Sequence, residues 1–206
     1  MHSRIPLTMC LPVLCAYFLV IATDAQQTNG EPAADREQIE SEISYLRNQA
    51  AGGDTMANYQ LGHSYMTGTG VSLNYSEAAK FLHAAAEQGL TEAEVVLGYL
   101  YENGKGVPQD YRRAFDYYAA AARQGNLTAE DNLAVMYEYG RGVHKNIRQA
   151  VDLHRHAAEG GNVVAQCNLG TLYFRGRNVT QNYAQAAQWF RKAAESGYAP
   201  GQQILA

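Results

Sequence analysis

Cysteine is scarce in this chain of 206 residues, which contains only three. Cys10 and Cys15 lie in an apolar stretch near the N-terminus, and Cys167 is the only cysteine in the rest of the sequence. If the apolar stretch is removed during export, no disulfide can form within the chain. The stability of the mature chain must then come from packing alone.

Basic residues are too few and too scattered to predict a nucleic-acid-binding surface. The chain contains 16 Lys and Arg against 20 Asp and Glu, for a net charge of −4 at pH 7. Proteins that bind nucleic acids concentrate basic side chains on one face, where they neutralise phosphates. Because no such cluster occurs, we expect no nucleic-acid partner.

The sequence also lacks the usual catalytic motifs. It contains no Gly-x-Ser-x-Gly, and the serine and lysine of the stretch 76–80 are one residue too far apart for the Ser-x-x-Lys of penicillin-binding enzymes. The Gly-x-Gly-Val loops lack the third glycine and the preceding strand of a phosphate-binding loop. Cys167 has no assignable basic partner that would activate it as a nucleophile. We therefore expect no catalytic residue, no cofactor and no enzymatic activity.

The one long apolar run, Leu7–Ala22, follows two basic side chains and has the form of a secretory signal peptide. Small residues favour cleavage after Ala25, with cleavage after Ala22 as a second option. An uncleaved membrane anchor is the alternative, but the run is short for a span and contains Pro12. We predict a signal peptide over residues 1–25.

Residues 26–35 are polar and predict a flexible tail. We expect the mature chain to be secreted or periplasmic, or to enter the lumen of the secretory pathway if the source is eukaryotic. No other segment is apolar enough to cross a membrane, so no stable membrane insertion is expected after cleavage. In a eukaryote the sequons at Asn74, Asn126 and Asn178 are candidates for glycosylation; in a bacterium these are ordinary loop and capping residues.

A strong internal repeat accompanies these absences. Residues of the same type recur four times at a spacing of 36 residues. The repeated positions include Ala57, Ala93, Ala129 and Ala165; Leu61, Leu97, Leu133 and Leu169; Tyr65, Tyr101, Tyr137 and Tyr173; Ala78, Ala114, Ala150 and Ala186; and Gly89, Gly125, Gly161 and Gly197. A fixed period of this length indicates a stacked array of structural repeats, which we interpret as one domain with a continuous core.

Each repeat divides into two helical halves. In the first copy, Ala57, Leu61 and Tyr65 lie on one face of a 3.6-residue period, and the glycines of the loop 68–71 then break the helix. The second half, around residues 78–86, again carries apolar residues at helical spacing and ends at a glycine. The sequence therefore predicts an all-α fold of antiparallel helix pairs.

Histidines of the third copy are the candidates for a metal site. His154 and His156, in a His-x-His spacing on a helix, point apart by about 200°, which makes a poor chelate. His154 also stands at the place that Leu82, Tyr118 and Phe190 occupy in the other copies. We therefore interpret His154 as a packed core residue and expect no metal site.

One copy can be written as Leu97-Gly98-x-x-Tyr101-x-x-Gly104-x-Gly106-Val107, then Ala114-x-x-Tyr117-Tyr118-x-x-Ala121-Ala122-x-x-Gly125. This pattern resembles the Sel-one-like repeat, a longer-looped relative of the tetratricopeptide repeat. The resemblance covers the copies 57–92, 93–128, 129–164 and 165–200. It implies an all-α fold, a right-handed α–α superhelix (solenoid) within residues 36–206.

The ends of the array are also in register. Tyr45 and Leu46 lie 36 residues before the corresponding residues of the first copy, which predicts a lone second-type helix over about residues 36–52 as a cap. Leu205 lies 36 residues after Leu169, which predicts a half-repeat cap at the other end as well. Two positions depart from the pattern: Asn178 replaces a loop glycine, and Ala134 replaces the glycine after the repeated leucine, a change of one methyl group.

The resemblance to tetratricopeptide solenoids implies a concave groove lined by the first helix of each pair. Positions beside the Leu-Gly pair vary from copy to copy, whereas the core positions do not, so they are candidates for ligand contacts. They are Tyr59, His63, Met66, Glu92, Val95, Tyr99, Glu102, Asp131, Val135, Glu138, Cys167, Thr171 and Phe174. Aromatic and acidic side chains together suit a peptide with apolar and basic groups.

We therefore expect an exported scaffold or adaptor that binds a protein or peptide. Tyr99 and Phe174 are the predicted apolar anchors, and Glu102 and Glu138 are predicted to select basic groups. A solvated face without a ligand is one alternative. Another is a cell-wall-related hydrolase or penicillin-binding activity, as described for some cysteine-rich relatives; the missing Ser-x-x-Lys and the missing cysteine pairs argue against it.

Overall fold

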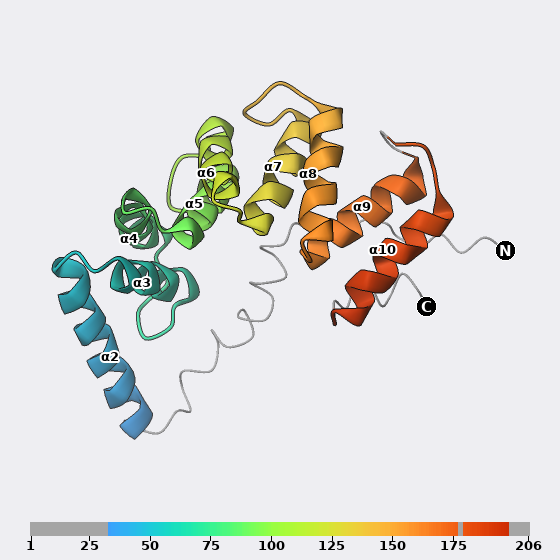
Figure 1. Ribbon diagram of the computed structural model, residues 1–206. Coiled ribbons are helices and arrows are strands. Elements are labelled where there is room, and N and C mark those ends of the chain that lie inside the picture. Colours follow the sequence, from blue (N-terminus) through green and yellow to red (C-terminus); the bar gives the residue numbers. More distant parts are fainter. Residues whose placement is uncertain (1–32, 177–178, 198–206) are drawn as a thin grey trace. The chain divides into compact units, whose positions relative to one another are not determined.

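The computed structural model describes residues 33–176 and 179–197, and every regular element in these ranges is a helix (Figure 1). The predicted signal peptide and the residues after Pro200 lie outside the described residues. The helices are α2 (Ala33–Ala51), α3 (Thr55–Thr67), α4 (Tyr75–Glu87), α5 (Thr91–Asn103), α6 (Tyr111–Arg123), α7 (Leu127–Tyr139), α8 (Ile147–Glu159), α9 (Val163–Arg175) and α10 (Tyr183–Glu195).

The described residues form two compact units. The unit 33–124 contains α2 and the helix pairs α3–α4 and α5–α6, and the unit 125–197 contains the pairs α7–α8 and α9–α10. Within each unit the second helix of one pair also packs on the first helix of the next, α4 on α5 and α8 on α9 (Figure 1). The prediction of an all-α fold of helix pairs is confirmed.

All eight helices of the pairs are 13 residues long, and seven of them begin at a residue whose side chain caps the helix; Leu90, before α5, is the exception. Asp110, for example, accepts the backbone N–H groups of Arg112 and Arg113 at the start of α6. Each first helix ends at a glycine in the left-handed conformation, such as Gly104 at φ 65°. Because these signals recur with the period of the sequence, so do the helix boundaries.

Two of the three sequons begin at such capping residues. Asn74 accepts the backbone N–H groups of Ser76 and Glu77 at the start of α4, and Asn126 accepts that of Ala129 at the start of α7. Both asparagines therefore have a structural task whether or not they carry a sugar. The third, Asn178, lies outside the described residues.

In the unit 33–124, the loop that follows a first helix packs tightly on the preceding second-type helix. Gly106 has φ 70°, and a Cβ there would collide with the backbone of Tyr75, the first residue of α4. Ser76 Oγ donates a hydrogen bond to the carbonyl oxygen of Gly106 at 3.1 Å. The second loop glycine is therefore required both by its conformation and by the close approach.

The helix α2 takes the place of a second-type helix at the N-terminal end of the array. A Cβ at Gly70 would lie 2.6 Å from Cγ2 of Ile39, and Ile39 stands 36 residues before Tyr75. Residues 39–51 of α2 thus correspond to the whole of α4, and α2 begins six residues earlier, at Ala33. The predicted tail therefore ends sooner than expected, because α2 extends beyond the repeat length.

Polar residues on α2 replace the small residues that other second-type helices use for close packing. Glu42 and Gln49 stand where α4 has Ala78 and Ala85, and both side chains are exposed. In α4 the two alanines are completely buried. Because a long polar side chain prevents a further helix from approaching as closely, α2 serves as a cap.

Within a pair, the two helices meet at a position that is glycine in three copies. A Cβ at Gly98 would lie 2.5 Å from Cε1 of Tyr118, so the tyrosine ring lies directly against the α5 backbone. The third copy has Ala134 at this position and His154 at the place of the tyrosine. The extra methyl is therefore not a minor change, because a ring placed like that of Tyr118 would collide with it.

Candidate interaction surface

One side of each first helix points away from the second helix of its own pair. We call it the first-helix stripe, and helical spacing assigns four residues per copy to it. They are Met56, Gln60, His63 and Thr67 in α3; Glu92, Val96, Tyr99 and Asn103 in α5; Thr128, Asn132, Val135 and Tyr139 in α7; and Val164, Asn168, Thr171 and Arg175 in α9. Four of them, Thr67, Tyr99, Asn132 and Val164, are buried, and the others are at least partly exposed.

Five of the predicted groove residues lie on this stripe. They are His63, Glu92, Tyr99, Val135 and Thr171. Glu92 is exposed, whereas His63, Val135 and Thr171 are half-buried. Burial lowers the pKa of His63, so its imidazole is predominantly neutral at pH 7. Apart from Tyr99, these side chains are at least partly exposed, and their role in ligand contact stays a prediction.

Tyr99, a predicted anchor, is already engaged by its own chain. Only 9% of it is exposed, and Lys105 Nζ donates a hydrogen bond to its hydroxyl at 2.6 Å. The same ammonium lies 4.9 Å from the centroid of the Tyr99 ring and 5.2 Å from that of Tyr75. Lys105 thus lies between two aromatic rings. Because Tyr99 is buried and holds Lys105, little of its ring is accessible to a partner.

The remaining predicted groove residues lie at the edge of the first helix that adjoins the second helix. Tyr118 Oη donates a hydrogen bond to Glu102 Oε2 at 3.1 Å, and the Phe174 ring lies 5.5 Å from the Tyr183 ring. Five members of this group are buried: Met66, Val95, Asp131, Glu138 and Cys167. The expectation that these five face an open groove is corrected, because their side chains are buried.

Asp131 and Cys167 show why the helix edge is internal. Asp131 is 1% exposed, and its Oδ1 lies 2.6 Å from Nδ1 of His154, which is also 1% exposed. Cys167 is fully buried in a cluster with Ala186 and Phe190 of α10. The interpretation of His154 as a packed core residue is confirmed.

A third residue completes this buried polar group. Asn168 of α9 donates through Nδ2 to both carboxylate oxygens of Asp131, at 3.2 and 3.0 Å. Asp131, His154 and Asn168 therefore join α7, α8 and α9. The sequence named Asp131 and His154 separately and did not pair them. The available signal was that His154 and Ala134 depart from the pattern in the same copy.

A second histidine–carboxylate pair lies at the surface of the same unit. His156 Nδ1 is 2.6 Å from Glu130 Oε2, and the His156 side chain is 70% exposed. The hydrogen bond to Glu130 raises the pKa of His156, and the charge of Glu130 adds to this effect. His156 and His154 thus have separate carboxylate partners.

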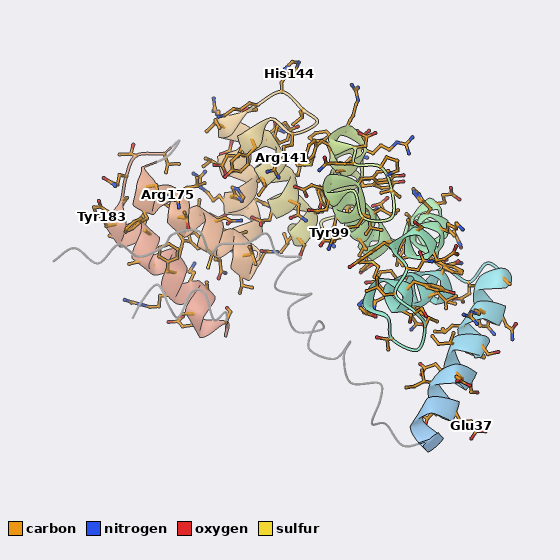
Figure 2. The ribbon with its side chains drawn as sticks, turned by 180° about the vertical axis from the view of Figure 1, so that it is seen from behind. Glu37, Tyr99, Arg141, His144, Arg175 and Tyr183 are labelled. Carbon is orange, nitrogen blue, oxygen red and sulfur yellow. The ribbon has the colours of Figure 1, made fainter. Side chains whose placement is uncertain are left out.

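The last helix pair presents aromatic side chains to solvent. Phe174 is 37% exposed and Tyr183 is 62% exposed, with their rings in an edge-to-face arrangement. Figure 2 shows Arg175 and Tyr183 at neighbouring places on α9 and α10. Tyr139 on the stripe of α7 is 52% exposed, and Arg141 lies 5.3 Å from the centroid of its ring. Accessible aromatic and basic groups therefore occur together in the unit 125–197.

The two units differ in charge. Residues 33–124 contain 12 Asp and Glu and seven Lys and Arg, a net charge of −5, whereas residues 125–206 contain six and eight, a net charge of +2. In the second unit Glu130, Asp131 and Glu138 are buried, so half of its acidic side chains lie away from the surface. The exposed charge of the second unit is accordingly more basic than its composition indicates.

The described ranges contain no cluster of three His, Cys, Asp or Glu side chains that could hold a metal ion. In the same ranges, no helix has both the length and the apolar character needed to span a bilayer.

The model of the Sel1 repeat family matches the chain at residues 55–90, 91–126, 128–162 and 163–198. These matches follow the four copies recognised in the sequence and begin about two residues earlier, at the start of each first helix. No curated protein matches the chain.

Solved structures show the same repeat. The chain is 32% identical to a Sel1 repeat protein from Oxalobacter formigenes, with a TM-score of 0.78 over 81% of this chain and 66% of that one. It is 40% identical to c5321, a protective antigen of uropathogenic Escherichia coli with an SLR fold, with a TM-score of 0.72 over 79% of this chain. The chain spans about a third of that antigen, 35% of its length.

A more distant likeness supports the fold alone. The immunity protein Pa5087 from Pseudomonas aeruginosa is 20% identical, with a TM-score of 0.57 over 93% of this chain and 69% of that one. The helix pairs, the four family matches and the Sel1 structures together establish an all-α repeat superhelix. The chain belongs to the Sel1 repeat family.

Proposed function

We propose that this chain is an exported scaffold that binds a polypeptide partner through the first-helix stripe and the exposed aromatic pair Phe174–Tyr183. Proteins of the Sel1 repeat family are in general scaffolds for protein–protein interaction. Stacked helical repeats suit this task because they present an extended row of side chains on a rigid framework.

The observation that carries the proposal is the contrast between constant and variable positions. Core positions repeat in all four copies, whereas the stripe presents a different side chain in nearly every copy. Met56, Tyr139 and Phe174 are large apolar side chains with 51%, 52% and 37% exposure on the first helices. Aromatic and other large side chains that retain solvent exposure are the groups that usually dominate binding energy at interfaces.

The partner's chemistry follows from the charges of the two units. In the unit 33–124, Glu92 and Glu102 remain at least partly accessible and favour basic side chains. In the unit 125–197, the buried acids leave Arg175 and other basic groups to favour acidic side chains. Each unit is therefore expected to favour partner segments of the opposite charge that also carry apolar anchors. Glu138 has no selective role in this proposal because it is buried.

Export rests on the form of residues 1–25. Expression of the full-length chain in a bacterial host, followed by fractionation and N-terminal sequencing, tests this part. We expect a mature protein that begins at Gln26 and is recovered from the periplasm or the medium. Recovery of a cytoplasmic protein that keeps Met1 would contradict export without affecting the binding proposal.

Site-specific photo-crosslinking tests the binding surface. A benzoylphenylalanine placed at Gln60 or at Tyr139, both exposed stripe positions, should form covalent adducts with the partner in the native compartment. Matched controls are Leu73 and Lys80, which are exposed but lie in a loop and on a second helix. Each stripe position should give a specific adduct that is absent from both controls. Adducts formed only at the control positions would place the binding surface elsewhere.

Affinity measurements with the identified partner then test the anchors. Phe174→Ala and Tyr139→Ala should each weaken binding by about 1–2 kcal/mol, because each removes an exposed aromatic contact. Leu73→Ala, which removes a side chain of similar exposure outside the stripe, should leave the affinity unchanged. Far-ultraviolet circular dichroism of all three variants should match the parent.

A further inference from the structure

His83 joins the first helix pair of the unit 33–124 to both helices of the second pair. Its Nε2 lies 3.1 Å from the hydroxyl oxygen of Tyr101 on α5, and its Nδ1 lies 3.1 Å from the hydroxyl oxygen of Tyr117 on α6. The Tyr101 and Tyr117 rings stack with centroids 5.7 Å apart, and each lies 5.9 Å from the imidazole. One half-buried imidazole on α4 thus holds two hydroxyls of the next repeat.

Arg113 favours one direction for these hydrogen bonds. Its Nη1 donates to the Tyr101 hydroxyl oxygen at 3.0 Å, and its guanidinium lies 5.4 Å from the centroid of the same ring. With that oxygen already accepting from a cation, the Tyr101 proton is free to be donated to Nε2 of His83. Nδ1 of His83 then carries the hydrogen that is donated to Tyr117. This arrangement requires a neutral imidazole.

In other copies of the repeat, the position of His83 is occupied by arginine, which carries a permanent positive charge. His83 stands 36 residues after Arg47 and 72 residues before Arg155. On α2, Arg47 Nη2 donates to the hydroxyl of Tyr65, which corresponds to Tyr101, at 3.3 Å. The link between α2 and α3 therefore uses a group that is charged at every ordinary pH, whereas the link from α4 to α5 uses one that titrates.

We infer that His83 is an acid-sensitive latch between the first two repeats, closed when its imidazole is neutral and released when it is protonated. A protonated imidazole has no lone pair for the Tyr101 proton and places a second cation beside Arg113. Both changes weaken the contact between α4 and the pair α5–α6.

The groups around the latch come from every helix packed against α4. Arg113 and Tyr117 approach from α6, and Tyr101 approaches from α5, where Glu94 also lies and bonds Gln124. Tyr65 from α3 stacks on Phe81, and Glu87 lies on α4 itself. Burial lowers the pKa of His83, Glu87 opposes this, and Arg113 lowers the pKa further. The neutral form is therefore the folded-state form at pH 7, and release is expected below about pH 6.5, the ordinary histidine value.

Release of the latch affects the part of the stripe that α5 carries. The stripe residues Glu92, Val96 and Tyr99 are on the helix whose contact with α4 depends on His83. Acidification should therefore increase local opening of α5 without unfolding the chain. This expectation concerns the junction alone and holds whatever the stripe binds.

Hydrogen exchange of the mature chain, compared at pH 5.5 and pH 7.5 after correction for intrinsic rates, tests the latch. We expect the protection of amides 97–102 to fall by roughly five-fold at the lower pH in the parent protein, while amides 169–174 in α9 serve as the internal reference. In His83→Gln, whose amide can bond but cannot titrate, protection of 97–102 should change no more than the reference. An equal pH response in parent and variant would overturn the inference, and the comparison also subtracts any contribution of His63.

A nuclear magnetic resonance titration of the His83 ring supplies a second test that does not depend on the variant's stability. Arg113→Gln should raise the pKa of His83, and Glu87→Gln should lower it, because each removes a charge that acts on the imidazole in the stated direction. If neither substitution moves the titration, the ring does not occupy the hydrogen-bonded position between the tyrosines, and the latch is refuted.

Discussion

In the α5–α6 pair a tyrosine ring lies against a glycine, whereas in the α7–α8 pair the same places hold an imidazole and an alanine. Tyr118 is completely buried against Gly98, and its hydroxyl donates to Glu102 at the edge of α5. Burial holds the pKa of Tyr118 well above its usual value, so this ring is neutral throughout the ordinary pH range. We call the place of this ring, against the glycine position of the first helix, the slot. In the α5–α6 pair the slot is filled by apolar surface with one polar atom at its margin.

The α7–α8 pair achieves the same close approach with a polar network. His154 is smaller than tyrosine, and its hydrogen bond to Asp131 directs the imidazole to the preceding turn of α7. Ala134 can then replace glycine without a collision. Buried polar groups are costly unless every hydrogen-bond partner is present. The stability of the α7–α8 pair therefore depends on Asp131 and Asn168, whereas that of the α5–α6 pair depends on no single polar residue. The comparison teaches that one slot in a repeat can be satisfied by shape or by hydrogen bonding, with different sensitivity to substitution.

Removal of Asp131 should therefore have the largest effect. Asp131→Ala leaves the buried His154 and the half-buried Asn168 without their acceptor, and we expect the free energy of unfolding to fall by about 3–5 kcal/mol. Trp189, the single tryptophan of the chain, lies in the same unit and reports its unfolding in urea by fluorescence. The matched control is Glu102→Ala, which should cost about 1 kcal/mol because it removes one hydrogen bond at a half-buried site. Because Glu102 lies in the other unit, its unfolding is followed by circular dichroism. Equal losses would show that the network has no special weight.

Substitution at the glycine position should have the next largest effect. Gly98→Ala forces a Cβ to within 2.5 Å of the Tyr118 ring and should cost about 1–3 kcal/mol through overpacking. The reverse change, Ala134→Gly, creates no collision and should cost about 1 kcal/mol or less, from helix propensity. Urea unfolding followed by circular dichroism measures both. If Gly98→Ala were neutral, the ring of Tyr118 would have to move freely, and the distinction between the two pairs would fail.

The two units should also respond to pH in opposite directions. The folded-state pKa of His83 lies below its unfolded value, so the folded unit 33–124 binds fewer protons and loses stability as the pH falls below about 6.5. The folded-state pKa of His156 lies above its unfolded-state pKa. The stabilising effect of His156 is therefore complete below the unfolded-state pKa and is lost as the pH rises through the folded-state pKa.

Urea unfolding of the parent, His83→Gln and His156→Gln at pH 5.5 and pH 8.5 measures this contrast. We compare the free energy of unfolding of each variant with that of the parent. For His83→Gln, the difference should favour the variant more at pH 5.5 than at pH 8.5. For His156→Gln, it should favour the variant less at pH 5.5 than at pH 8.5. Both effects should be small, since His156 is largely exposed and His83 only half-buried. The same sign for both variants would contradict the assignment.

Substitution on the open side of a first helix should have the smallest effect. Glu92→Ala, at an exposed stripe position, should change the free energy of unfolding by less than about 0.5 kcal/mol. Glu138→Ala should cost more, because Glu138 is buried at the edge toward the second helix. Equal, small losses from both would indicate that the two edges of a first helix are equivalent, contrary to the burial of Glu138.

Much of the fold could be predicted from the sequence because its signals are local and recur. The repeated Leu61 and its counterparts, the loop glycines such as Gly106, and the correspondence of Leu46 with Leu82 are readable without any knowledge of tertiary contacts. The open side of the first helices was identified only in part. His63 and Glu92 were selected, whereas Gln60 and Tyr139 on the same stripe were missed although helical spacing places them there.

The sequence by itself determined the repeat length, the two helices of each repeat and the cap formed by α2, because capping residues and apolar spacing act within a few turns of chain. Only the tertiary structure decided which edge of each first helix is covered. The burial of an edge depends on how closely the paired helices approach each other and on which side chain of the second helix packs against the glycine position. Asp131 and Tyr59 stand at the same place in the repeat, yet Asp131 is buried against His154 and Tyr59 is only half-buried.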